Sequence, residues 1–397
     1  MNFVKQVLQI LYNKGDIYPD TYEGWYCTPC ESFWSPSQAK NGLCPDCHRP
    51  VERLKENNFF FRLSKYQDWL INYIQDNPDF IKPDFRLNEV VSFLKNNKLS
   101  DLCISRPKER LSWGIELPFS KEHVCYVWFD ALLNYISAVG KFDSQGNYYS
   151  VWWPADLHLI GKDILRQHAI YWPIILHSLG IKPPRMIFAH GWWLVGKDKI
   201  SKSRGNIVDP ENIIEKFGVD TFRYFLLRDV PFGLDGSFSE ESFVKRLNSD
   251  LANDLGNLVY RVLSMIEKYF AGSIPSANLE ILKEPLEKKI LEKLNFLEQE
   301  ISLNLKGRDL DFSSALEKIW ELINMANKYI EEKKPWNLFK ENRSEELKAF
   351  LSLLIVIIKS VKDKIYPFMP QTSQKIQMQV EGGIVKKSTP LFSRIEE

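Results

Sequence analysis

The sequence predicts an α/β fold, with part of a parallel sheet and a metal-binding insertion, followed by an all-α helix bundle. In the middle of the chain, short β-prone segments alternate with helical segments, which is the pattern of a parallel sheet. Four cysteines lie in two close pairs upstream of that pattern, and strand-like segments stop at Ser239. We therefore predict four regions: a helix at 1–20, a metal-binding insertion at 21–120, the sheet at 121–238 and the bundle at 239–397.

The composition is that of an ordinary globular protein. Of 397 residues, 44% are hydrophobic and 26% are charged, which argues against disordered and collagen-like chains. The 52 basic and 51 acidic residues nearly cancel, so the net charge neither supports nor excludes a nucleic-acid partner. The longest apolar run, at 350–358, is far shorter than the roughly 20 residues that cross a bilayer. We expect a cytoplasmic protein without a membrane partner.

The first 120 residues mix helical segments with a turn-rich stretch. Apolar residues recur at helical spacing over 2–14, which predicts an amphipathic helix there. Turn-forming residues dominate 21–53, and the aromatic run at 58–61 follows them. Two further segments, 63–74 and 87–97, have the periodicity of helices.

The cysteine pairs read Cys27-x2-Cys30 and Cys44-x2-Cys47, separated by 13 residues. Each pair forms a tight knuckle that offers two thiolates to one side, and four thiolates suit a tetrahedral Zn²⁺ ion. The spacing therefore predicts one closed, structural zinc site. Four unligated cysteines are the alternative, and His48 is a substitute ligand next to Cys47.

The predicted sheet consists of short strands that each end at a polar or glycine-containing turn. Active sites of parallel sheets lie at such carboxyl ends, so the residues that follow the strands are candidates for the site. The third strand leads directly to His190 and Gly191. The predicted strands are 125–129, 157–160 and 186–189, and the predicted helices after the first two are 131–139 and 164–179.

A cationic loop follows the last strand, between Gly196 and Asn206. A mobile basic flap can neutralise the charge that builds up on a polyphosphate in a transition state, although a solvated loop is the simpler interpretation. A helix is predicted after it, because Asp209 is a good N-cap, Pro210 suits the first turn and Gly218 suits the end.

Only helical periodicity is found in the last 159 residues. The apolar residues repeat over long stretches without strand patterns, which indicates an antiparallel helix bundle. The segment 272–284 connects two of the bundle helices. The predicted helices are 243–266, 285–303, 312–331 and 344–365.

The amino-acid sequence of the cationic loop at 196–206 is specific. Lys199–Ser203 reads Lys-Ile-Ser-Lys-Ser, which matches the KMSKS signature of class I aminoacyl-tRNA synthetases with isoleucine in second position. With the motifs below, the chain resembles methionyl-tRNA synthetases over nearly its whole length. The resemblance implies a Rossmann-like sheet, activation of L-methionine by ATP with Mg²⁺, and transfer to tRNA(Met) in protein biosynthesis. It implies catalytic roles for Asp163, Lys199, Ser201 and Lys202, and ATP contacts from His190, Gly191, Lys199 and Lys202.

Two segments, Val127–Tyr135 and Ile160–His168, resemble the walls of the family's methionine pocket. The resemblance implies that Asp163 holds the substrate amino group. A polarizable, unbranched sulfur side chain is well held by aromatic and imidazole edges. Without the resemblance, the aromatic residues and the histidine are ordinary core residues. The remaining implied pocket residues are Trp128, Ala131, Leu132, Tyr135, Ile164 and His168.

In the bundle, Leu251–Arg261 and Lys333–Trp336 resemble the family's anticodon-reading elements. Asn257 and Arg261 are four residues apart and share a helix face. An amide and a guanidinium can bind splayed base edges while Trp336 stacks on a base, which is how single-stranded RNA is read. A solvated helix face and a core tryptophan are the alternatives.

One departure from the family concerns ATP binding. None of the six histidines lies in a H-x-G-H segment, the signature that the family carries before a helix like that at 2–14. We therefore expect the 397-residue chain to be incomplete alone, with the other half of the Rossmann-like sheet in a longer frame or a separate chain. The alternatives are another class I aminoacyl-tRNA synthetase, or a non-catalytic tRNA-binding zinc protein derived from a synthetase.

Overall fold

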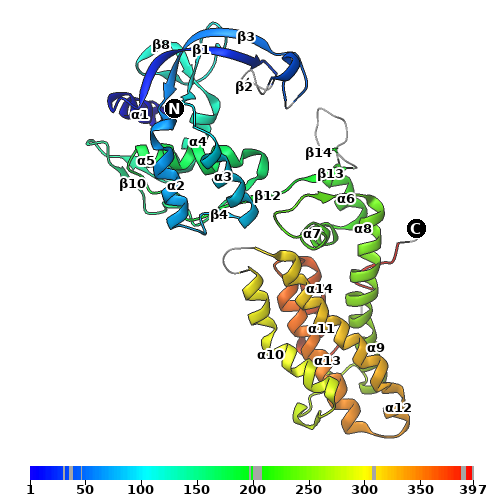
Figure 1. Cartoon of the computed structure of the whole chain (residues 1–397). Coiled ribbons are helices and arrows are strands. Elements are labelled where there is room, and N and C mark those ends of the chain that lie inside the picture. Colours follow the sequence, from blue (N-terminus) through cyan, green and yellow to red (C-terminus); the bar gives the residue numbers. More distant parts are fainter. Residues whose placement is uncertain are drawn as a thin grey trace. The chain divides into compact units, whose positions relative to one another are not determined.

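The chain, in a computed structural model, divides into two compact units, Met1–Ala189 and His190–Glu397 (Figure 1). Each unit has a hydrophobic core of its own. The predicted region boundaries after residues 20, 120 and 238 stay predictions. The structure describes all residues except 30–31, 35–38, 46, 196–197, 200–207, 306–309, 386–389 and 396–397.

The first unit begins with helix α1 (Asn2–Asn13), which confirms the helix predicted at 2–14. One face of α1 is buried in the core of the unit, as its apolar periodicity requires. The buried residues of that face are Val4, Val7, Leu8 and Leu11.

A long antiparallel hairpin carries the cysteine segment (Figure 1). Strand β1 (Ile17–Cys27) pairs with β3 (Glu52–Phe61) along its whole length, so the turn-rich stretch is shorter than the 21–53 expected. Polar residues are tolerated there because only the inner end of β3 is buried and the backbone groups are paired. The sheet order is β2 (Ser32–Trp34), β1, β3, β5 (Leu102–Cys103).

A three-stranded sheet forms the centre of the first unit, in the order β11 (His158–Gly161), β12 (Ile187–His190), β4 (Ile81–Lys82). Strands β12 and β4 are parallel, which confirms the predicted parallel sheet. Strand β4 comes from within the predicted insertion at 21–120, so part of that segment belongs to the sheet.

The strand predicted at 125–129 is wrong. Strand β8 (Ser120–Cys125) ends at the first residue of that range and pairs antiparallel with β6 (Ser105–Pro107) and β7 (Glu116–Leu117). Helix α4 (Val127–Ser137) takes the aromatic residues into its first turn, where Phe129 is fully buried. Asp130 lies in the same turn, where a carboxylate favours the helix start.

Helices cover the sheet of the first unit. The helix predicted at 164–179 is present but divided, because a π-helical turn precedes its regular part. The remaining elements of the unit are α2 (Gln67–Asp76), α3 (Asp84–Asn96), η3 (Lys162–Ile164), the π-turn η4 (Gln167–Tyr171), α5 (Trp172–Ser178), β9 (Lys141–Phe142) and β10 (Tyr148–Tyr149).

The second unit opens with a small sheet of β13 (Trp193–Val195), β14 (Asp198–Lys199) and β15 (Gly236–Ser237). Helix α6 (Pro210–Phe217) follows and is capped as predicted, because the Asp209 carboxylate accepts a hydrogen bond from the Glu211 amide at 3.0 Å. Gly218 ends it at φ +88°, and α7 (Val219–Arg228) begins there.

The predicted bundle is confirmed in the second unit (Figure 1). Within the described part of the chain, no helix combines the length and the apolar content that a bilayer crossing requires. The bundle elements are α8 (Glu240–Arg246), the π-helical η6 (Leu247–Gly256), α9 (Asn257–Phe270), α10 (Pro285–Leu305), α11 (Phe312–Lys333), α12 (Pro335–Lys340), α13 (Ser344–Ile365) and α14 (Pro370–Val380).

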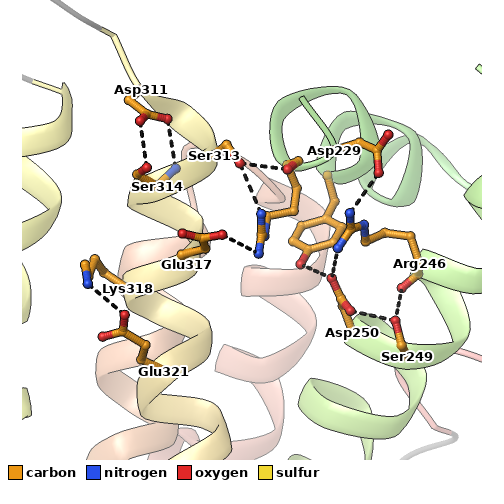
Figure 2. Close-up of polar contacts among 12 residues, drawn as sticks. Asp229, Arg246, Ser249, Asp250, Asp311, Ser313, Ser314, Glu317, Lys318 and Glu321 are labelled. Atoms are coloured by element: carbon orange, nitrogen blue, oxygen red, sulfur yellow. Dashed lines mark hydrogen bonds and ion pairs between the residues drawn. The ribbon is translucent and has the colours of Figure 1, made fainter. Parts of the chain in front are cut away.

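A polar network centred on Asp250 joins α7, α8 and η6 (Figure 2), and a hydrogen bond from Trp320 connects it to α11. The Asp250 carboxylate accepts a hydrogen bond from Tyr224 at 2.8 Å and pairs with Arg246 at 3.3 Å. Arg246 also pairs with Asp229 at 2.8 Å, and Trp320 Nε1 donates to the Asp250 carbonyl at 3.2 Å. Because partly buried charges need partners, this network fixes the four elements to one another.

Candidate functional site

The predicted methionine pocket is built around a hydrogen bond between two helices of the first unit. Tyr135, on α4, lies with its hydroxyl oxygen 3.0 Å from Nε2 of His168 on η4. Nδ1 of the same imidazole lies 2.9 Å from the carbonyl oxygen of Ile164. His168 is only 2% exposed, whereas Tyr135 is half-buried. The structure therefore brings together three of the predicted pocket residues.

These contacts select one tautomer of the neutral imidazole. A carbonyl oxygen only accepts, so His168 Nδ1 donates to Ile164, and in the neutral ring Nε2 then accepts the hydrogen bond from the Tyr135 hydroxyl. Burial lowers the pKa of His168 and raises the pKa of Tyr135. Both side chains are therefore neutral at neutral pH, and this wall of the pocket carries no charge that would repel an ammonium group.

The other predicted pocket residues lie on the neighbouring turns. Trp128 and Ala131 are half-buried on α4, whereas Leu132 is fully buried and packs in the core of the unit. Asp163, in η3, is exposed one residue before the carbonyl that holds His168. An exposed carboxylate thus lies one residue from the carbonyl that orients this uncharged wall, an arrangement that suits a ligand with one ammonium group.

Sequence reasoning missed an aromatic cluster around Tyr135. The ring of His158, on β11, lies 4.2 Å from that of Tyr135, and Trp172 lies 6.0 Å from it, with Trp153 a further 5.9 Å from Trp172. Burial, and the neighbouring His168, lower the pKa of His158 to about 4. Trp172 stands four residues after His168, so helical spacing was the signal that could have identified it.

A cavity of about 280 Å³ opens beside this cluster. It is lined mainly by aromatic and aliphatic side chains, which is the usual composition of a small-molecule site. Its lining residues are Tyr135, Val139, Trp152, Trp153, Ala155, Leu157, His158 and Leu159.

The predicted metal ligands meet at the end of the β1–β3 hairpin. The sulfur atoms of Cys27, Cys44 and Cys47 lie within 4.8 Å of one another, and those of Cys27 and Cys47 are 3.5 Å apart. Thiolates on one tetrahedral zinc ion lie about 3.8 Å apart. The second knuckle is closed by a hydrogen bond from the His48 amide to the Cys44 carbonyl at 2.9 Å. Cys30 lies outside the described residues, and the three sulfurs fit a metal site.

The predicted ATP-binding residues are only partly described. Lys199 ends β14, opposite Leu194 of β13, and its side chain is not described. Ser201 and Lys202 lie outside the described residues.

The turn at His190 and Gly191, by contrast, is well defined. His190 Nδ1 donates to the Gly191 carbonyl at 2.8 Å, and its ring stacks on Phe232 at 5.9 Å. A Cβ atom at Gly191 would lie 2.2 Å from the Leu234 carbonyl oxygen, so only glycine fits.

The predicted RNA-reading residues lie at the surface of the second unit. Asn257 is exposed at the first residue of α9, and Arg261 pairs with Glu331 of α11 at 2.6 Å. Trp336 is 41% exposed on α12, whereas its neighbour Pro335 is buried. The alternative that Trp336 is a core residue is therefore wrong.

A buried carboxylate anchors the corner that precedes Trp336. Glu287, on α10, accepts a hydrogen bond from Tyr329 at 2.7 Å and pairs with Lys333 at 3.1 Å. Burial acts to raise the pKa of Glu287, but hydrogen bonds from Tyr329, the Glu284 amide and Lys333 lower it below its ordinary value. This ionised group holds the last turn of α11, from which α12 departs.

The comparisons with known proteins agree on one family. The model of the family described as tRNA synthetases class I (M) matches residues 1–53 and 49–263. The methionine–tRNA ligases of Clostridium acetobutylicum and Clostridium perfringens are 49% and 48% identical to this chain. The alignments cover 95% and 96% of this chain and 58% of each relative. The chain thus spans less than two thirds of the length of these relatives.

Solved structures show the same similarity. Mycobacterium tuberculosis methionyl-tRNA synthetase in complex with methionyl-adenylate superposes with a TM-score of 0.89 and 39% identity, over 99% of this chain and 80% of that one. The free-state structure of the same synthetase superposes with a TM-score of 0.86 and 37% identity, over 100% of this chain and 81% of that one. From the family match, the relatives and the shared fold together, the chain belongs to the class I tRNA synthetases of the methionyl (M) type.

Proposed function

We propose that this chain acts as a methionine–tRNA ligase, activating L-methionine with ATP and transferring it to tRNA(Met) for translation in the cytoplasm. The observation that carries the proposal is the neutral hydrogen-bonded pair of half-buried Tyr135 and buried His168, with the exposed carboxylate of Asp163 one residue before the carbonyl that orients the imidazole. A neutral wall accepts the thioether without competing for the ammonium group, which is left to Asp163. Support also comes from the similarity to a synthetase solved with methionyl-adenylate.

The reaction has two steps. The methionine carboxylate oxygen attacks the α-phosphorus of ATP, the bond from that phosphorus to the bridging oxygen breaks, and pyrophosphate leaves. A ribose hydroxyl of the terminal adenosine then attacks the methionyl carbonyl, and AMP leaves. Lys199 and Lys202 are proposed to stabilise the charge on the departing pyrophosphate, with Ser201 between them and His190–Gly191 at the adenosine side. Mg²⁺ accompanies ATP as part of the substrate.

We propose that Cys27, Cys30, Cys44 and Cys47 hold one structural zinc ion. Three of the four sulfurs already converge, and all four ligand types are thiolates, which favours zinc over magnesium or calcium. When bound, the ion would close the outer end of the β1–β3 hairpin and supply no reactive group.

The proposed RNA partner is tRNA(Met), bound at its anticodon by Asn257, Arg261 and Trp336. The exposed face of Trp336 suits base stacking. Arg261 is held by Glu331, so its guanidinium is oriented before RNA arrives. Residues outside this chain, in a longer frame or a separate chain, are proposed to bring the H-x-G-H segment.

Methionine-dependent exchange of pyrophosphate into ATP tests the proposal. Residues 1–397 alone should exchange poorly, because their sequence contains no H-x-G-H segment. Adding the part of the Clostridium acetobutylicum relative that this chain does not cover should restore exchange. Lys202→Ala should then lower the rate at least tenfold with little change in methionine affinity, whereas Lys202→Arg should retain part of it.

Two results would contradict the proposal. Tight binding of tRNA without methionine binding or exchange, even after complementation, would favour the non-catalytic RNA-binding alternative. Exchange that depends on an aliphatic amino acid other than methionine would show that the pocket residues were misassigned.

A further inference from the structure

We propose that Phe339, supported by Tyr269, forms a second base-stacking platform next to Trp336, which binds another unpaired base of the same RNA loop. This inference rests on the proposed RNA-reading function of the second unit and extends it to residues outside the sequence motifs. The geometry points to it through the exposure of Phe339, its ring contact with Tyr269 and its position one helical turn from Trp336.

Helix α12 presents both aromatic residues to solvent. Phe339 is 51% exposed and Trp336 is 41% exposed, whereas Pro335 and Leu338 face the core. Residues three positions apart lie on the same side of a helix, with Cβ atoms about 5–6 Å apart. Two π-faces are therefore available one turn apart, on the same helix.

Tyr269 orders the second platform. Its ring centroid lies 4.7 Å from that of Phe339, with 30° between the ring planes, so the two rings are in close, tilted contact. This contact leaves half of Phe339 exposed and restricts its rotation before any ligand binds. A ring held in place loses less entropy on binding a base than a free side chain does.

The platform continues the predicted RNA surface. Tyr269 is in the last turn of α9, the helix that begins with Asn257 and carries Arg261. Asn257 and Tyr269 are twelve positions apart, which is about 18 Å along the helix at 1.5 Å per residue. Stacked nucleotides advance about 3.4 Å per strand position, so this length accommodates more than one base.

Three lysine side chains lie on or next to the two helices that form the platform. Lys268 Nζ lies 5.4 Å from the centre of the Tyr269 ring, and exposed Lys334 and Lys340 border α12 at its two ends. Ammonium groups beside exposed aromatic faces suit a chain that alternates phosphates with flat bases. The occupant that matches this combination is single-stranded RNA.

Binding of a labelled hairpin RNA with a CAU loop to the full chain tests the proposal. Phe339→Ala should weaken binding about five- to hundredfold, the range seen when a stacking aromatic is removed. Phe339→Tyr should stay within about twofold, because it keeps the π-face. Phe296→Ala is a matched control on α10, since Phe296 is 52% exposed, and should leave the affinity unchanged.

Phe339→Leu separates stacking from packing. Leucine keeps an apolar side chain against Tyr269 but has no π-face, so this variant should melt like the wild type and bind RNA as weakly as Phe339→Ala. Binding restored by leucine would overturn the stacking proposal. A set of RNA hairpins, each lacking one loop base, should locate the two stacking partners. Phe339→Ala should no longer weaken binding when one particular base is missing, and Trp336→Ala should no longer weaken it when a different base is missing.

The outcomes distinguish this inference from the function on which it rests. If Trp336→Ala weakens binding and Phe339→Ala does not, the second platform is refuted and the RNA-reading function stands. If neither substitution weakens RNA binding, both the second platform and the proposed RNA-reading function are refuted. Equal loss for the CAU hairpin and a fully paired RNA duplex would show that Phe339 does not stack on an unpaired base, and would overturn the proposal.

Discussion

The two candidate binding regions are built in opposite ways. In the first unit, the proposed amino-acid pocket depends on His168, which is buried and hydrogen-bonded at both ring nitrogens. In the second unit, the proposed RNA surface depends on Trp336 and Phe339, whose side chains are about half exposed to solvent. A small ligand is selected by a preformed pocket, whereas an RNA loop is selected by exposed aromatic rings that stack on its unpaired bases.

This difference has a consequence for mutagenesis. Substitutions in the pocket remove packing and hydrogen bonds that also stabilise the first unit, so binding and stability should fall together. On the RNA surface, Trp336→Ala removes a ring that is 41% exposed in the free chain, so RNA binding should fall with little change in stability. The predictions below test whether the pocket and the RNA surface differ in this way, and by how much.

The largest effect is expected from zinc. Purified protein should contain one zinc ion per chain, and Cys44→Ser should abolish it, because small zinc modules bind the ion with about 10–16 kcal/mol. The β1–β3 hairpin end should lose order, while RNA affinity of the second unit stays unchanged. Metal analysis and RNA binding measure the two responses.

Cys103→Ser is the matched control for zinc, since Cys103 is a buried cysteine on β5. It should retain the metal. Zinc loss in this control, or zinc retained after Cys44→Ser, would contradict the assignment.

The second effect concerns stability. His168→Ala should lower the free energy of unfolding by about 2–4 kcal/mol, because it leaves a cavity and removes a partner from Tyr135. Methionine binding should be lost as well. Trp336→Ala should change stability by less than about 0.5 kcal/mol. Denaturation midpoints of the wild type, His168→Ala and Trp336→Ala measure the difference. Equal destabilisation by the two substitutions would contradict the distinction between the buried pocket and the exposed RNA surface.

Local signals predicted much of this molecule. Asp209, Pro210 and Gly218 predicted both ends of α6, because capping is decided within a few residues. The cysteine spacing likewise predicted convergence of the sulfurs that the structure describes.

Features that depend on contacts between distant segments were not predictable. The segment 127–129 is β-prone by composition, yet it starts α4 because burial of Phe129 outweighs propensity. The packing of His158 on Tyr135 joins a strand and a helix that are separate in the sequence. The Phe339–Tyr269 contact arises in the same way, from two helices of the bundle.

The smallest predicted effect is a difference in pH response. Burial holds the pKa of His158 at about 4, against 6.5 for an ordinary histidine. Between these values the unfolded chain carries a proton that the folded chain lacks, so the free energy of unfolding falls as the pH is lowered. In the second unit, burial and the neighbouring Asp250 raise the pKa of Asp254 from 3.8 to about 6. There the folded chain carries the extra proton, and stability rises as the pH is lowered.

The two groups should therefore oppose each other between about pH 6 and pH 4. His158→Phe keeps an aromatic ring but cannot bind a proton. It should therefore decrease the slope of the unfolding free energy against pH by up to the equivalent of one bound proton per chain, whereas Asp254→Asn should increase that slope. Denaturant unfolding at several pH values measures both slopes. Since other titrating groups are common to all three proteins, they cancel in the differences between variant and wild type. Parallel pH curves for wild type and His158→Phe would show that His158 is not desolvated, and that the pocket is more open than its contacts indicate.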